Sequence, residues 1–419
     1  MLQPTTVRHP HQWPEAPHPY GAFTLRSAFQ PIFSISHQRL IGHEALLRAI
    51  DLSGVCVSPQ SMFRRCADAA ESRAFDQVCR SLHARTFANL REAAQWLFLN
   101  VDASSFEAHC GGSGPVSSML DTARDAGLAP SQIVIELLEG ALPDGPDIVD
   151  WADELKRQGF LIALDDFGAG HSNFDRVFRL RPHIVKLDRG VIARAAQDAM
   201  VRRVTTQMIS LLHECGALVL VEGIETAREA AIAMDADADF VQGYYFGHPA
   251  PSLCDPTKSN DALESVWQSC DERYLQETAT YRHRLRPYAE ALTRAGELLE
   301  AGQPMAQACA AFLSLAESDV CYLLSSDGSQ VGENVRRGTA QVRADAAGRF
   351  APLWDAKGAR WSRRPYFRRA VACPGQLQVT RPYPTMQSHR ICVTLSICFG
   401  SGDGKLIICG DMLWSASEC

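Results

Sequence analysis

Seven polar side chains follow short apolar runs in the first 250 residues, at or near the point where each run ends. Most stand directly after the run, as in the segments LFLN, IVIE, LIALD, IVK and LVLVE. A charge at the inner end of a buried strand is costly unless it is paired or bound to a metal. The catalytic groups of a parallel barrel come from the carboxyl ends of several strands. In chain order the seven residues are Glu44, Asn100, Glu136, Asp165, Lys186, Glu222 and Gln242. We therefore expect them to converge on one site.

Four of these side chains offer hard oxygen ligands, which suit Mg²⁺ or Mn²⁺ better than zinc. They are Glu44, Asn100, Glu136 and Asp165. Asp166 follows Asp165 directly, and adjacent strand residues point in different directions. The two aspartates could therefore serve two metal ions about 3.5–4 Å apart, the spacing used in phosphoester hydrolases.

The remaining three groups suit the handling of a phosphate and of an attacking water. Lys186 supplies a cation for a phosphate oxygen or for the water. Glu222 can orient that water or act as a general base, and Gln242 is a neutral hydrogen-bonding group. The glycine-rich segment Phe167–Gly170 could close over the site, although a simple turn explains the same residues.

The elements that must position these groups alternate along the chain. Short runs rich in Val, Ile, Leu and Phe predict buried strands: Leu25–Ile35, Leu40–Leu47, Trp96–Val101, Ile133–Leu137, Phe160–Leu164, Ile184–Leu187, Ala217–Val221 and Asp239–Val241. Amphipathic stretches between them predict helices: Met119–Ala126, Ile148–Gln158, Val201–Cys215 and Thr226–Met234. This alternation predicts an α/β fold, a TIM-type (β/α)8 barrel of about 230 residues. Only Ser36–Arg39 separates the first two runs, so we expect an antiparallel first strand.

These residues resemble one family closely. The segment His43–Arg48, HEALLR, resembles the motif that names the EAL domains, the cyclic di-GMP phosphodiesterases. The resemblance runs from about Phe23 to Pro249 and includes FQPI at 29–32, NV at 100–101, ELLE at 136–139, DDFGAG at 165–170, VKLD at 185–188, EGIET at 222–226 and QGY at 242–244. It implies a modified TIM barrel, a Mg²⁺ or Mn²⁺ site and hydrolysis of cyclic di-GMP to linear pGpG. It also implies a homodimer.

The resemblance assigns roles residue by residue. Glu44, Asn100, Glu136 and Asp165 would be metal ligands, with Asp166 on a second ion. Lys186 and Gln242 would position the water, Glu222 would be base or ligand, and Glu139 would tether the loop that begins at Asp165. Gln30, Leu46 and Arg48 would contact the dinucleotide, and we expect Asp188 from the VKLD motif to do the same.

The sequence departs from the family pattern at three places. Leu138 stands where the family usually has Thr, and Gly140 lies two residues further on. After Gly170 the loop reads His171-Ser172-Asn173, where the family usually has Tyr-Ser-Ser. Asp102 stands where the family commonly has Ser. None of these changes removes a metal ligand, so we expect an active enzyme. The alternative is a catalytically weak or inactive EAL-type receptor or protein-interaction module. A third interpretation keeps the barrel and changes the substrate to another phosphodiester.

The chain is expected to have four parts: a disordered Pro-rich leader at 1–20, the barrel at 21–254, a helical linker at 255–304, and a last domain at 305–419. The linker is polar, and we expect Pro287 to interrupt it. Apolar residues then recur at helical steps from Leu285 to Leu299. This pattern fits a linker, a dimer helix or a helix that covers the barrel.

The last domain resembles a PAS-like or Cache-like sensory module of α+β class. We expect a helix at Ala306–Ala316, a strand at Val320–Leu324 and a hairpin of Arg390–Phe399 with Lys405–Leu413. The stretch Arg349–Ala370 interleaves basic and aromatic residues and could bind a small carboxylate ligand or form a minor nucleic-acid patch. A solvated basic face with core aromatics is the interpretation that such a run of charges favours. We expect this domain to adjust the activity of the barrel.

Composition limits the class of protein. The 419 residues carry 41 Lys and Arg against 48 Asp and Glu, a net charge of −7, which argues against general nucleic-acid binding. No apolar run approaches the roughly 18 residues of a membrane span, and no signal peptide is visible. The 14 cysteines form no CxxC pair, so we expect reduced thiols in a cytoplasmic protein.

Overall fold

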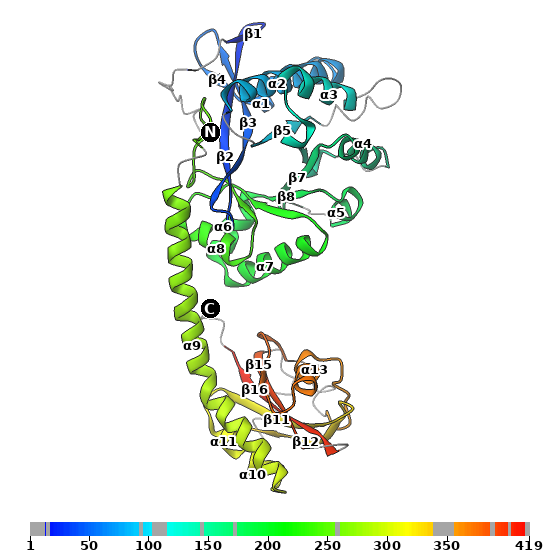
Figure 1. The fold of residues 1–419 in the computed structure, drawn as a ribbon, viewed down its shortest axis with the longest axis vertical. Coiled ribbons are helices and arrows are strands. Elements are labelled where there is room, and N and C mark those ends of the chain that lie inside the picture. Colours follow the sequence, from blue (N-terminus) through cyan, green and yellow to red (C-terminus); the bar gives the residue numbers. More distant parts are fainter. Residues whose placement is uncertain are drawn as a thin grey trace. The chain divides into compact units, whose positions relative to one another are not determined.

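The computed structural model describes residue 13 and residues 17–91, 95–102, 115–142, 146–170, 174–255, 260–337, 356–385, 390–400 and 404–414. The chain divides into two compact units, Met1–Glu272 and Arg273–Cys419. The first contains a barrel and the second an antiparallel sheet (Figure 1).

The barrel closes with eight strands, as predicted. They are β2 (Phe23–Ser34), β3 (Arg39–Asp51), β5 (Trp96–Val101), β6 (Ile133–Leu138), β7 (Leu161–Phe167), β8 (Ile184–Leu187), β9 (Leu218–Val221) and β10 (Phe240–Val241). The first strand, β2, pairs antiparallel with both β3 and β10, and the other neighbours pair in parallel. Two short strands pair antiparallel with barrel strands: β1 (His18–Tyr20) lies beside β2, and β4 (Cys56–Val57) lies beside β3.

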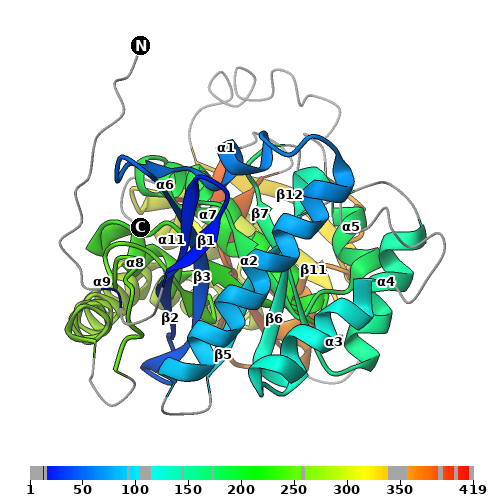
Figure 2. The same cartoon turned by 90° about the horizontal axis from the view of Figure 1, so that it is seen from above.

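Helices surround the barrel on its outer side. They are α1 (Pro59–Phe63), α2 (Ala69–Leu90), α3 (Pro115–Ala126), α4 (Pro146–Arg157), α5 (Phe174–Leu180), α6 (Arg189–Gln197), α7 (Ala199–Glu214) and α8 (Ala227–Asp235). Figure 2 shows α2 to α5 following one another around the strands. Side-chain caps fix several helix starts: Asp68 accepts a hydrogen bond from the backbone of Glu71, and Thr226 forms a capping box with Glu229.

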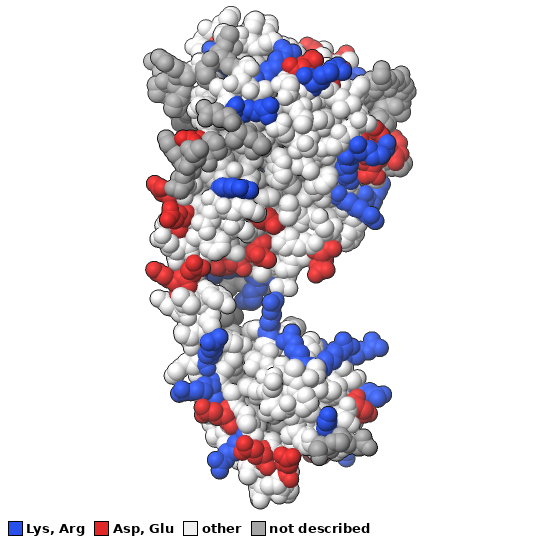
Figure 3. Space-filling view, viewed as in Figure 1, with Lys and Arg blue, Asp and Glu red and all other residues white. Residues whose placement is uncertain are grey.

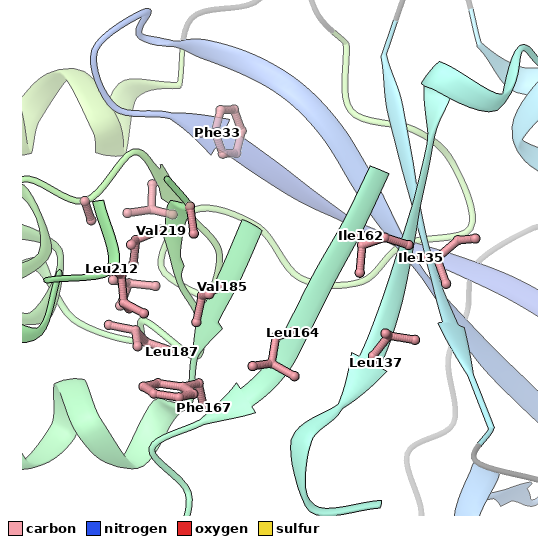
Figure 4. Close-up of a cluster of buried hydrophobic side chains, with 14 of the residues drawn as sticks. Phe33, Ile135, Leu137, Ile162, Leu164, Phe167, Val185, Leu187, Leu212 and Val219 are labelled. Carbon is pink, nitrogen blue, oxygen red and sulfur yellow. The ribbon is translucent and has the colours of Figure 1, made fainter. Parts of the chain in front are cut away.

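Alternation along the strands produces two apolar layers. Residues that point outward, such as Ile135, Ile162, Leu164 and Val185, pack against helical residues such as Leu212 and form the large core cluster (Figure 4). Residues that point inward form a separate cluster inside the barrel: Ile32, Phe98, Val134, Ala163, Ile184, Leu220 and Phe240. Because side chains alternate with a period of two, each strand contributes to both layers.

A 40-residue helix, α9 (Asp261–Glu300), corrects one expectation. We expected Pro287 to interrupt it, but the helix continues through that residue. Near its start, Leu263 and Val266 belong to the core of the barrel unit. On both sides of Pro287, Leu285 and Leu292 belong to the core of the second unit. We attribute the continuity to this packing, which offsets the backbone hydrogen bond that proline cannot donate.

The second unit is a six-stranded antiparallel sheet with helices on both faces. Its strands are β11 (Ser318–Ser325), β12 (Gln330–Arg336), β13 (Gln378–Val379), β14 (Tyr383–Pro384), β15 (Ile391–Phe399) and β16 (Leu406–Leu413), in the order β12-β11-β16-β15-β13 with β14 beside β15. One face packs on α9 and α11 (Ala310–Ser314), and the other packs on α13 (Pro365–Ala372). The strand β11 and the β15–β16 hairpin were predicted, whereas β12 and α13 were not.

Four smaller expectations can be compared with the structure. The helix expected at Ala306–Ala316 is two short helices, α10 (Met305–Ala308) and α11. Residues 18–20 of the expected leader form β1, and most of the preceding residues lie outside the described part of the chain. Every cysteine in the described part is a free thiol. No helix among the described residues is long and apolar enough to cross a membrane.

Candidate active site

The expected site residues form a polar layer at one rim of the barrel. In or directly after each parallel strand from β5 onward, a polar residue stands two positions after an inward-facing apolar residue, so both point into the barrel. The pairs are Phe98 and Asn100, Val134 and Glu136, Ala163 and Asp165, Ile184 and Lys186, Leu220 and Glu222, and Phe240 and Gln242. In β2, which runs in the opposite direction, Gln30 precedes Ile32 and pairs with Glu44.

Lys186 lies at the centre of this layer. Its side chain is only 1% exposed, and its Nζ lies 2.7 Å from Glu136 Oε1 and 2.9 Å from Asp165 Oδ1. The same Nζ lies 3.3 Å from Glu222 Oε2 and 3.8 Å from Glu44 Oε2. One ammonium group therefore joins carboxylates from β3, β6 and β7 and from the residue that directly follows β9. Acidic and basic side chains are also interspersed on the face of the barrel unit in Figure 3, so burial rather than charge distinguishes this cluster.

Three amide side chains extend the cluster. Asn100 Nδ2 donates to Glu44 Oε1 at 3.0 Å, and Gln242 Nε2 donates to Glu44 Oε2 at 2.7 Å. The Nε2 group of Gln242 also lies 3.3 Å from Gln30 Oε1. Close approach of the backbone fixes Gln242, because a Cβ on the next residue, Gly243, would lie 2.1 Å from the carbonyl oxygen of Ile224. Glu44 is therefore held by hydrogen bonds on both carboxylate oxygens.

A bulge in β7 places the two adjacent aspartates. The register of β7 with β8 shifts between Leu164 and Phe167, and Asp166 adopts a φ of +57°. The backbone N–H of Asp166 donates to Asp165 Oδ1 at 2.9 Å. As a result, carboxylate oxygens of Asp165, Asp166 and Glu222 lie within 4.8 Å of one another.

The electrostatics of the site are those of an acid cluster with too little positive charge. Burial raises the pKa of Glu136 and of Glu222 well above the ordinary value, and burial with the charge of Asp165 raises the pKa of Asp166. Burial alone would lower the pKa of Lys186, but the surrounding carboxylates outweigh it and raise that pKa well above its usual range. Lys186 therefore stays protonated at neutral pH.

The residues present fit divalent cations. Among the described residues, the buried atoms Glu136 Oε2, Glu222 Oε1 and Gln242 Oε1 have no hydrogen-bond partner. Buried acceptors without donors are costly, and five carboxylates face a single ammonium group. Carboxylate and amide oxygens are the ligands that Mg²⁺ and Mn²⁺ prefer, so cations would satisfy both the charge and the free oxygens.

A cavity of about 550 Å³ adjoins the polar layer. Glu44 and Asn100 line one part of it, together with Leu46 and with Leu138, which is 41% exposed. Another part is lined by α1 and by Asp76, Cys79, Arg80 and His83 of α2. These α2 residues could not be predicted from the sequence, because charged side chains in an amphipathic stretch normally indicate a solvent-facing surface.

The structure places the other expected residues less centrally. Asp188 caps α6 by accepting a hydrogen bond from the backbone N–H of Gly190 at 2.8 Å. Arg48 Nη1 donates to the carbonyl of Leu47 at 3.0 Å. Glu139 is buried just after β6 and is not among the residues that contact Lys186. The altered loop residues 171–173 lie outside the described part of the chain.

A comparison with protein families decides which barrel this is: the model of the EAL domain matches residues 21–249. This chain belongs to the EAL domain family. Its EAL domain is 34% identical over 123 residues to the probable cyclic di-GMP phosphodiesterase PdeD of Escherichia coli, a match covering 29% of this chain and 22% of PdeD. It is 25% identical over 236 residues to the cyclic di-GMP phosphodiesterase NbdA of Pseudomonas aeruginosa, which covers 54% of this chain and 29% of NbdA. The chain thus spans less than a third of the length of these curated relatives.

A solved structure resembles more than the EAL domain. The Bacillus subtilis YkuI protein, solved with its substrate c-di-GMP and calcium, aligns with 93% of this chain and 96% of its own, with a TM-score of 0.77 and 19% identity. At that identity the likeness concerns the fold, and it extends beyond the barrel into the second unit.

The second unit contains a smaller polar cavity of about 50 Å³. Trp361, Arg364 and Tyr366, from the stretch in which we expected a carboxylate ligand, line it together with Asp411. Residues 349–355 of that stretch lie outside the described part of the chain. Burial raises the pKa of Asp411 in this cavity to about 7.

Proposed function

We propose that this chain hydrolyses cyclic di-GMP to linear pGpG and that it uses two divalent cations, Mg²⁺ or Mn²⁺, to do so. The observation that carries the proposal is the cluster of four strand-borne carboxylates around the buried Lys186, beside a cavity of about 550 Å³. Membership of the EAL domain family and the similarity to the cyclic di-GMP phosphodiesterase NbdA and the probable cyclic di-GMP phosphodiesterase PdeD support the choice of substrate.

The chain's own residues would hold the cations in two overlapping groups. Glu44, Asn100, Glu136 and Asp165 would bind one ion, and Asp166 would bind the second together with Asp165 or Glu222, whose oxygens lie within 4.8 Å of one another. Bound there, a divalent cation lowers the pKa of a coordinated water and neutralises charge on the phosphate.

Glu222 is the group we propose as general base. Its Oε1 has no hydrogen-bond partner among the described residues, and burial raises its pKa well above the ordinary value, which makes the carboxylate a stronger proton acceptor. In the reaction the water oxygen would bond to phosphorus and its proton would pass to Glu222, while the bond from phosphorus to the 3′ oxygen breaks. The leaving 3′ oxygen would take up a proton, either that one from Glu222 or one from solvent, and become the 3′ hydroxyl group. Gln242 would orient the water, since its Oε1 is buried and without a donor among the described residues.

Lys186 has a different part in this proposal. Because its pKa is raised well above the usual range, it does not release a proton at neutral pH. Its charge instead offsets the carboxylates and the negative charge that develops on the phosphate. It also keeps Glu136 and Asp165 within 3 Å of one nitrogen, which preserves the geometry of the ligands.

We also propose that the second unit is a PAS-like sensory module that adjusts the rate of the barrel, and that the protein acts as a homodimer. The continuous helix α9 supports the regulatory proposal, because its residues belong to the cores of both units. Sedimentation of the full chain tests the oligomeric state. If Asp411→Asn in the full chain leaves the rate of hydrolysis unchanged with and without candidate carboxylate ligands, regulation through this unit is contradicted.

Chromatography of the nucleotides after incubation with purified protein tests the proposed function directly. We expect pGpG with Mg²⁺ or Mn²⁺ and none with chelator. Glu44→Gln should lower kcat at least about 1,000-fold with an unchanged circular dichroism spectrum, whereas Glu264→Gln on the exposed face of α9 should have no effect. Tight binding of cyclic di-GMP without product would instead identify a receptor, and an E44Q variant as active as the parent would overturn the mechanism.

A further inference from the structure

One face of α2 carries polar groups into the substrate cavity. Asp76, Cys79, Arg80 and His83 are spaced as i, i+3, i+4 and i+7, so they lie on the same side of the helix. All four are buried, and they line the cavity that Glu44 and Asn100 also line. A ligand whose phosphate lies against the acid cluster therefore has room to extend towards α2.

Arg80 is unusual among these groups because its hydrogen-bonding capacity is largely unused. Its side chain is 5% exposed, and its Nε lies 3.2 Å from Asp76 Oδ2 without hydrogen-bond geometry. Its Nη1 donates to the sulfur of Met119 at 3.0 Å, and a thioether is a weak acceptor. The described residues contribute no other partner to this guanidinium, which has five N–H donors.

We propose that Arg80 recognises the Hoogsteen edge of a guanine base of the bound dinucleotide. A guanidinium group matches the two acceptors O6 and N7 of guanine bidentately, whereas adenine presents N7 and an amino donor at the same edge. A base in this position would satisfy the donors of Arg80 that protein groups leave unused. The proposal rests on cyclic di-GMP being the ligand and adds the residue that selects its base.

The neighbours of Arg80 suit this role. Asp76 holds one edge of the guanidinium, so it is a positioning residue that leaves the terminal nitrogens for the ligand. His83 is tied to Ser27, with Nδ1 2.7 Å from the hydroxyl oxygen. Burial and the nearby Arg48 lower the pKa of His83 to about 4, so this wall of the cavity adds a neutral ring at pH 7.

Binding of cyclic di-GMP and of its 7-deazaguanine analogue, which lacks the N7 acceptor, tests the assignment. Affinities are measured by calorimetry in chelator, and turnover is measured separately with Mn²⁺. The parent protein should bind the analogue at least about tenfold more weakly. Arg80→Lys keeps the charge beside Asp76 but loses the planar fork, so it should bind both nucleotides within about twofold of each other. Arg85→Lys, on the exposed side of the same helix, should behave as the parent.

The outcomes separate the two proposals. If R80K keeps the parent's preference for N7, Arg80 does not read the base, whatever the hydrolytic activity. If the parent binds with the expected preference but forms no pGpG, only the hydrolysis is overturned. If the parent does not bind cyclic di-GMP, both proposals fall. Should R80K unfold, the double variant Arg80→Gln with Asp76→Asn removes both charges together and must also lose the preference.

Discussion

The carboxylates of Glu136 and Asp165 in the barrel and that of Asp411 in the second unit are all buried, but their partners differ. The barrel carboxylates share one ammonium group and repel one another. Asp411 accepts hydrogen bonds from neutral hydroxyl groups, at 2.7 Å from Thr394 Oγ1 and at 3.4 Å from Tyr322. The first arrangement leaves carboxylate oxygens without hydrogen-bond donors among the described residues, whereas the second supplies its carboxyl group with neutral donors.

This difference shows that burial of an acid does not by itself indicate chemistry. Burial raises the pKa of Asp411 to about 7, and no ammonium or guanidinium group forms a salt bridge with it among the described residues. In the barrel, by contrast, buried oxygens of Glu136, Glu222 and Gln242 have no donors within the described chain. Acceptors left open around a protonated lysine are the feature that distinguishes the barrel cluster from Asp411.

The largest effect should follow from removing the shared cation. Lys186→Met leaves four carboxylates without their common partner, so we expect kcat to fall at least about 1,000-fold. The free energy of unfolding should fall by about 3–5 kcal/mol at neutral pH. The measurements are product chromatography and urea unfolding.

The pH dependence of this variant has a definite sign. Carboxylates whose pKa is raised in the folded state bind more protons there than in the unfolded chain, so stability is lost as pH rises. The loss in K186M relative to the parent should therefore be greater at pH 8 than at pH 5. An equal loss at both values would mean that Lys186 acts only by packing.

The alternation of side chains along the β-strands determines which residues of this site the sequence alone can predict. A strand has a period of two, so a polar residue two positions after an inward Val134 or Ile184 must face inward as well, and Glu136 and Lys186 could be named without a structure. The bulge at Asp166 could not, because its positive φ depends on the register of β7 with β8.

The residues of α2 escaped prediction for the same kind of reason. A helix with charges at Asp76 and Arg80 normally turns them to solvent, and only the tertiary position of α2 over the barrel mouth buries them. The prediction at Pro287 was wrong for the opposite reason. Proline by itself predicts a break in the helix, but the packing of Leu285 and Leu292 keeps α9 continuous. Asp188 caps α6 in the structure, and its expected contact with the dinucleotide stays a prediction.

An intermediate effect should follow from Asp411→Asn. Raising a pKa from 3.8 to about 7 means that the folded state holds a proton that the unfolded chain has released, so the parent loses stability as pH rises from about 4 to 7. The asparagine variant lacks this loss. Relative to the parent, the second unit of D411N should gain up to about 4 kcal/mol between pH 4 and pH 8. Calorimetric unfolding of the full chain at several pH values measures this difference.

Asp327 offers a control of opposite sign. It is exposed, and hydrogen bonds from Ser325 and Ser329 lower its pKa to about 2. Its contribution is present above the unfolded value of 3.8 and is lost only as pH falls towards 2. Asp327→Asn should therefore change stability equally at pH 5 and pH 8. If D411N and D327N show the same pH dependence, Asp411 is not held neutral by its surroundings.

The smallest effect concerns the hydroxyl chain that leads to Asp411. The Tyr383 hydroxyl lies 2.5 Å from Thr394 Oγ1, which donates to Asp411 at 2.7 Å. Because threonine has a single hydroxyl proton, Tyr383 must be the donor in its bond to Thr394 while Asp411 is ionised. Tyr383→Phe should cost about 1 kcal/mol of unfolding free energy. Tyr322→Phe should cost less, since its hydroxyl is 3.4 Å from Asp411. A Y383F cost as large as that of K186M would mean that neutral hydrogen bonds hold this carboxyl group as strongly as the ammonium holds the barrel cluster.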